Sequence, residues 1–123
     1  MANAAAPTIL HIATRAAWEE GLRAGAYRAD SLDSEGFMHC SLPAQVVPSA
    51  ERHYPGARGL VLLAIAVDRV EPEVRYEAAS NGELYPHIYG PLNPAAVTQV
   101  VPFEPGPDGH FTLPPELAPP ELR

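Results

Sequence analysis

The chain has little of several features on which whole classes of proteins depend. It contains a single cysteine, Cys40, among 123 residues, so no internal disulfide can form and nothing points to an oxidising compartment. No apolar run approaches the roughly 20 residues that a membrane-spanning helix needs. The first residues carry no basic region followed by a long apolar stretch, and so do not resemble a signal peptide. We therefore expect a cytoplasmic protein without a membrane partner.

Positive charge is also scarce. Eight Lys and Arg residues face fifteen Asp and Glu residues, which gives a formal net charge of −7. An acidic surface repels phosphate backbones, so this balance argues against a nucleic-acid partner. Aromatic residues make up only 7% of the chain, yet 46% of it is apolar, which is enough for one modest core.

Proline, in contrast, is abundant. Fifteen prolines are far more than the ~5% of an average protein, so helices must be short and connections stiff. Six of them, with two glycines, lie in residues 105–123. We expect a single domain over residues 8–104, followed by an extended, Pro-rich tail over 105–123 that is partly docked.

Local patterns predict a domain with its helices early and its strands late. Thr14 is a candidate N-cap for the first helix, and Gly25 is its expected stop. The eight apolar residues 60–67 are typical of a strand buried on both faces. Residues 27–31 fit no element. We predict strands over 8–13, 36–41, 60–67, 74–77 and 97–103, and helices over 15–24 and 43–54. This order favours an α+β fold, a compact single domain with a split mixed or antiparallel sheet and two short N-terminal helices.

Three of the five histidines share an unusual setting. His11, His39 and His87 each lie inside a short apolar or aromatic run. Side chains two apart on a strand share a face, so His39 is flanked by an aromatic and a hydroxyl, and His87 by Tyr85 and Tyr89. A lone strand histidine is typically a hydrogen-bonded structural residue, but three buried imidazoles would each need partners. We predict that at least two of the three line one pocket.

Other chemistries receive less support. Three imidazoles suit Zn²⁺, but the chain has no His-x-His or His-Glu-x-x-His pair, so we expect no metal. Cys40 follows His39 and should face the core as a small hydrophobe. Ser41 shares a face with His39, although no Ser-His-Asp arrangement can be assembled. His53 and His110 lie among turn residues and are expected to be solvated.

Glu83 is the carboxylate of greatest interest. It follows a glycine turn and precedes a proline-stiffened aromatic run, which would hold it near His87. A carboxylate in that place would stabilise a developing cation, whereas the alternative is a solvated turn residue. Arg15 and Arg28 are the nearest basic residues for an anionic ligand.

Three segments together resemble a known family. Residues 9–14, 36–41 and 82–92 resemble, in order and spacing, the bacterial domain of unknown function 952 family, and the resemblance spans about residues 8–103. That family is similar in fold to the ADP-ribosyltransferases. The resemblance implies an α+β domain whose split sheet surrounds an NAD-binding cleft.

The transferases mark their cleft at three positions on separate strands. By resemblance, His11 occupies the first, in a His-x-x-Thr-like strand end that includes Thr14 and contacts the nicotinamide ribose. His39 falls near the second, and either Glu83 or His87 stands at the third. The arginines of the related RNA 2′-phosphotransferases are absent.

The resemblance also implies a chemistry. Departure of nicotinamide leaves an oxocarbenium-like carbon that needs a nearby negative group. Glu83 would stabilise that charge, His11 would hold the ribose hydroxyls, and Tyr85 or Tyr89 would pack on the nicotinamide ring. NAD would then be a substrate. The implied catalytic set is His11, His39, Glu83 and His87, and the implied NAD-binding set is His11, Thr14, Ser41, Tyr85 and Tyr89.

These observations leave three hypotheses. The first is an ADP-ribosyltransferase-like protein that binds NAD or a related nucleotide and transfers ADP-ribose. The second is a non-enzymatic module that binds a nucleotide or another small ligand, and the third is a histidine-based, metal-dependent hydrolase. All three predict a small-molecule partner, and we expect a monomer or a weak dimer.

Overall fold

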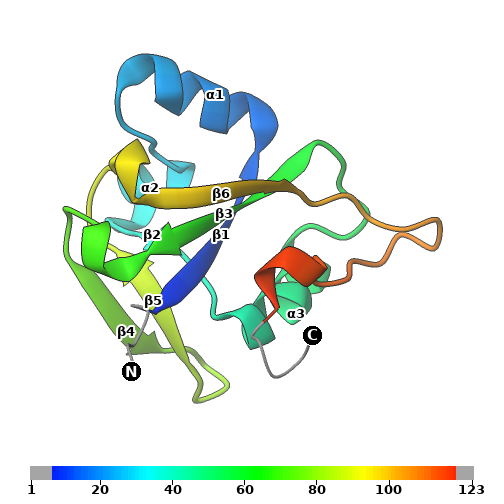
Figure 1. Ribbon diagram of the computed structural model, residues 1–123. Coiled ribbons are helices and arrows are strands. Elements are labelled where there is room, and N and C mark those ends of the chain that lie inside the picture. The colour runs from blue at the N-terminus through cyan, green and yellow to red at the C-terminus, as the bar shows by residue number, and fades with distance from the viewer. Residues whose placement is uncertain (1–6, 119–123) are drawn as a thin grey trace, which may run out of the picture.

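The most apolar run of the chain forms the centre of one sheet. In the computed structural model, which describes residues 7–118, Leu60–Ala66 (β3) is flanked by Thr8–Thr14 (β1) and Val97–Pro102 (β6) (Figure 1). Both pairings are antiparallel. Every residue of β3 except Ala66 is buried, as expected for a strand covered on both faces.

A second antiparallel sheet carries the later histidines. Its order is Met38–His39 (β2), Leu84–Ile88 (β5) and Val74–Ala78 (β4). Leu10 and Ser41 exchange backbone hydrogen bonds of 2.8 Å, which join this sheet to β1. The prediction of an α+β domain with a split antiparallel sheet is confirmed. The second strand is shorter than predicted, because only two residues of 36–41 pair with β5.

The first helix has the predicted bounds. Arg15–Ala24 (α1) begins where the Thr14 hydroxyl accepts a hydrogen bond from the Ala17 amide at 3.0 Å, and it ends at Gly25, whose φ is +86°. Pro43–His53 (α3) agrees with the second predicted helix. Short 3₁₀ turns cover Val67–Arg69, Pro94–Ala96 and Pro115–Leu117. No helix among residues 7–118 is long and apolar enough to cross a membrane.

The helices differ from the prediction in one respect. A third helix, Asp30–Glu35 (α2), stands where residues 27–31 fitted no element. Its six residues include one apolar side chain, Leu32, so it has no periodicity to detect. On α1, Trp18 is buried but Leu22 is half exposed, because the helix packs through Trp18 and Gly21.

The two faces of β3 support two apolar clusters. Val61, Leu63 and Ile65 pack in the first cluster, which includes Trp18 and Tyr27. The alternate residues of β3 pack in the second cluster, on the side of α3 and the C-terminal segment. Successive strand residues point to opposite faces, so one apolar strand serves both clusters.

The C-terminal segment closes the second cluster. The Phe111 ring stacks on Phe103 at 4.7 Å between ring centres, and Leu117 is also buried. Glu51 on α3 accepts a hydrogen bond from the Phe111 amide at 2.7 Å. The Pro-rich tail therefore first loops away from the domain and then packs against it through Phe111 and Leu117, with its 3₁₀ turn beside α3 (Figure 1); residues 119–123 lie outside the described residues.

Gly21 allows α1 to approach the segment after it. A Cβ at this position would lie 2.9 Å from both Cα and Cβ of Tyr27, closer than real contacts allow. We expect Gly21→Ala to lower the free energy of unfolding by about 1–3 kcal/mol in urea titrations. Glu20→Ala, an exposed change on the same helix, is the control. A Gly21→Ala protein as stable as wild type would contradict this close contact.

Candidate functional site

A cleft of about 890 Å³ lies among β1, the second sheet and the end of α3. Most of the predicted site residues line it, namely His11, Thr14, His39, Ser41, Tyr85 and His87. Glu83 and Tyr89 are not among its lining residues. Residues from four separate parts of the chain thus meet around one open hollow.

The three histidines are joined in space. The His11 Nδ1 atom lies 2.6 Å from the backbone oxygen of His39. His39 and His87 are direct partners across β2 and β5, and their ring centres are 5.3 Å apart. Opposite residues of an antiparallel pair project to the same face, which brings the two rings together.

His11 is the buried member of the group. Burial lowers its pKa from 6.5 to about 4, so the ring is neutral at neutral pH. A carbonyl can only accept, so Nδ1 carries the proton and donates it to the His39 oxygen. The other nitrogen, Nε2, accepts a hydrogen bond from the Tyr27 hydroxyl at 2.9 Å. Both ring nitrogens are therefore occupied within the protein, which suits a positioning role.

His39 is the exposed member. Its Nε2 lies 3.1 Å from Glu35 Oε2, at the end of α2. Its side chain is 56% exposed, against 13% for His87. Glu35 lines the cleft, as does Asp30 at the start of the same helix. Because α2 gives no periodic signal, neither carboxylate could be placed from the sequence.

His87 is held by a carboxylate, but not by the one expected. Glu77 Oε1 accepts hydrogen bonds from the Tyr89 hydroxyl at 2.5 Å and from His87 Nδ1 at 2.7 Å. The first of these, aided by the second, lowers the pKa of Glu77, and the same bond raises the pKa of Tyr89. The hairpin register explains the geometry: Glu77 pairs with Tyr85, so His87 lies diagonally across from it.

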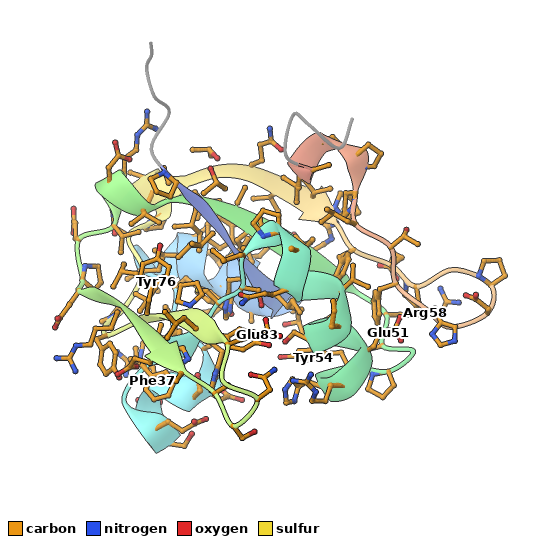
Figure 2. The ribbon with its side chains drawn as sticks, turned by 90° about the horizontal axis from the view of Figure 1, so that it is seen from below. Phe37, Glu51, Tyr54, Arg58, Tyr76 and Glu83 are labelled. Atoms are coloured by element: carbon orange, nitrogen blue, oxygen red, sulfur yellow. The ribbon has the colours of Figure 1, made fainter. Side chains whose placement is uncertain are left out.

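Glu83 lies in the turn of that hairpin. Its carboxylate accepts a hydrogen bond from the Gln45 side chain at 3.2 Å. Figure 2 shows Glu83 and Phe37 on the hairpin side of the molecule, and Tyr54 at the end of α3. Glu83 was expected near His87, but the carboxylate that contacts His87 is Glu77, whereas Glu83 bonds to Gln45 and does not line the cleft.

Basic residues reach the cleft from two parts of the chain. Arg52 and His53, in the last turn of α3, line it together with Tyr54. Arg28 also lines it and pairs with Asp33 at 2.6 Å, whereas Arg15 does not line it. His53 is exposed, as expected, but it lies on the cleft rim. The sequence predicted the helix over 43–54, but not what its C-terminal end faces.

Cys40 is buried in the first apolar cluster, as predicted. Burial raises the pKa of its thiol, which remains protonated and unsuited to nucleophilic attack. Within residues 7–118, no group of three or more His, Cys, Asp and Glu side chains is arranged to hold a metal ion.

Comparison with known proteins identifies the family. A family model described as "Protein of unknown function (DUF952)" matches residues 12–100. The chain belongs to the DUF952 family. No match is found among curated proteins.

Solved structures show the same fold in a bacterial relative of this DUF952 protein. The crystal structure of protein CC0527 from Caulobacter crescentus is 29% identical in sequence and superposes with a TM-score of 0.83, covering 91% of this chain and 99% of that one. The solution structure of CC0527 gives a TM-score of 0.77 at 29% identity, covering 90% of this chain and 97% of that one.

Proposed function

We propose that this DUF952 protein binds NAD or a related nucleotide in the cleft. The observation that carries the proposal is that aromatic and imidazole rings and an arginine line the same cleft. The second sheet contributes His39, Tyr85 and His87 to the lining, and the end of α3 contributes Arg52 and Tyr54. Aromatic and imidazole rings suit a base, and arginine suits a phosphate. The volume falls within the range of small-molecule sites.

Arg52 is the best placed group for a phosphate. Among residues 7–118 its guanidinium makes no ion pair, whereas Arg28, the other arginine of the cleft, is paired with Asp33. The chain carries a net charge of −7, so most of its surface repels anions. The unpaired Arg52 is therefore the place in the cleft where a negative ligand is attracted most strongly. The acidic remainder of the surface discourages long polyanions but leaves a small nucleotide free to enter.

Isothermal titration with NAD, and with ADP-ribose as a comparison, tests this function. We expect both to bind, because both carry the diphosphate. Arg52→Ala should weaken binding by about tenfold, as expected for a lost charge-assisted hydrogen bond. Arg58→Ala is the matched control, since Arg58 (Figure 2) does not line the cleft. Absence of binding heat for both ligands with folded protein would refute the proposal.

Transfer of ADP-ribose from bound NAD is the second candidate, in keeping with the fold resemblance noted above. Glu35 favours it, because a carboxylate that lines the cleft and contacts His39 would stabilise a cationic ribose carbon. Incubation with labelled NAD should then label an acceptor, and Glu35→Gln should reduce that labelling more than Glu83→Gln does. NAD binding without any turnover would instead indicate a binding module.

A further inference from the structure

The hydrogen bond between Glu77 and His87 suits His87 for proton transfer as well as for ligand binding. The carboxylate accepts the His87 Nδ1 hydrogen at 2.7 Å, which selects the tautomer with the proton on Nδ1. In the neutral ring the Nε2 lone pair is then free. A carboxylate that orients an imidazole in this way is the usual support of a general base.

The free nitrogen is open to the cleft. Among residues 7–118, no protein group makes a hydrogen bond to His87 Nε2, and no buried side-chain nitrogen or oxygen lacks a partner. Nε2 is therefore reached by solvent, although the side chain is only 13% exposed. His87 lines the cleft, whereas Glu77 and Phe37, which contact Nδ1 and the ring face, do not, so the exposed part of the ring lies on the cleft side.

The surroundings of the ring also fix its orientation. Phe37 stacks on His87 with ring centres 4.2 Å apart and planes 22° apart. This stacking fixes the plane of the imidazole, and the hydrogen bond to Glu77 fixes its rotation. Tyr89 donates to the same carboxylate oxygen, and Arg75 lies over the Tyr89 ring at 4.3 Å. Glu77 is thus held in place from two sides.

We infer that His87 is the general base of the cleft, and that it activates water to cleave the N-glycosidic bond of a bound nicotinamide nucleotide. This inference rests on the proposed function. The water oxygen forms a bond to the ribose C1′ carbon as the bond from C1′ to the nicotinamide nitrogen breaks. The bonding pair leaves with neutral nicotinamide, and the water proton passes to His87 Nε2. The products are nicotinamide, ADP-ribose and the proton.

Hydrolysis of the N-glycosidic bond to nicotinamide requires only one proton acceptor, which a single free imidazole nitrogen provides. Nicotinamide leaves without needing a proton, since the pair it takes neutralises its own positive charge. The reaction therefore needs a base for water and no acid for the leaving group. His11 is occupied at both nitrogens. The His39 side chain is 56% exposed and lies 3.1 Å from the Glu35 carboxylate. His87, in contrast, is only 13% exposed and is held by Glu77 at 2.7 Å, so His87 is the better oriented base. Glu77 is a positioning residue that acts through His87.

The test measures nicotinamide release from NAD alongside NAD binding by calorimetry. We expect His87→Asn to lower kcat by about 100-fold or more, in the range typical of a lost general base. Glu77→Gln should lower kcat at least tenfold while the dissociation constant for NAD changes less than twofold. Glu73→Gln is the matched control, because Glu73 lies on the same hairpin face, pairs with Arg75 and does not touch His87.

The outcomes separate the inference from the function on which it rests. If wild-type protein does not bind NAD, the proposed function fails and the inference fails with it. If NAD binds but no nicotinamide is released, binding stands and the catalytic role is overturned. The role is also overturned if Glu77→Gln and His87→Asn, both folded by circular dichroism, release nicotinamide at the wild-type rate. A Glu77→Gln change that raised KM alone would assign Glu77 to binding instead of positioning.

Discussion

Between pH 6.5 and pH 4, His11 alone is expected to remove about 3 kcal/mol from the free energy of unfolding. Burial lowers the pKa of His11 to about 4 in the folded protein, whereas the unfolded chain has the ordinary value near 6.5. In this window the unfolded chain binds a proton that the folded protein does not. The contribution is therefore fully present above pH 6.5, is lost as the pH falls, and levels off below pH 4.

Urea titrations at several pH values, compared with a variant, isolate this contribution from that of the carboxylates. His11→Asn retains a side-chain N–H for the His39 oxygen but does not titrate in this window. Its stability should therefore depend less on pH, by about the amount given above. His53→Asn is the control, because His53 is exposed. A His11→Asn protein with the same pH dependence as wild type would show that His11 is not held neutral by burial.

Removal of the Phe111 side chain should destabilise the protein by about 3–5 kcal/mol, the range for truncating a buried phenylalanine. Phe111 is buried and stacks on Phe103, so Phe111→Ala leaves a cavity between α3 and the first sheet. The backbone hydrogen bond that Glu51 accepts from Phe111 would also be lost if the segment came away. The same bond is the main reason that the pKa of Glu51 is lowered.

Urea unfolding and limited proteolysis measure the effect of Phe111→Ala. We expect a lower unfolding midpoint and faster cleavage after residue 104. Thr112→Ala, an exposed neighbour, should leave both unchanged. A Phe111→Ala protein with the stability and cleavage rate of wild type would mean that the segment contributes nothing to the second cluster.

Where local chemistry is strong, the predicted elements agree with the structure. The Thr14 hydroxyl and the positive φ of Gly25 bound α1, and both effects act within a few residues. The long apolar run of β3 identified the central strand by composition alone. The helix α2 was missed, because a six-residue polar segment has no apolar periodicity from which a helix can be predicted.

The candidate site was predictable to a lesser degree. His11, His39 and His87 share a setting that the sequence shows, and they do meet. Glu83 was predicted to lie near His87 because it follows a glycine turn and precedes the proline-stiffened run that contains His87. Across a hairpin, however, proximity depends on register, and the diagonal pairing of β4 with β5 places Glu77 against the ring.

The sequence by itself determined the central strand β3, the helices α1 and α3, and the core position of Cys40. It also showed that His39 and His87 lie on faces of mixed polarity. These properties follow from side-chain period and local capping. Only the tertiary structure decided that His11 is occupied at both nitrogens while His87 keeps one free. It also decided that Arg52 faces the cleft. Those outcomes depend on how strands far apart in the chain pair, and a single sequence does not specify that pairing.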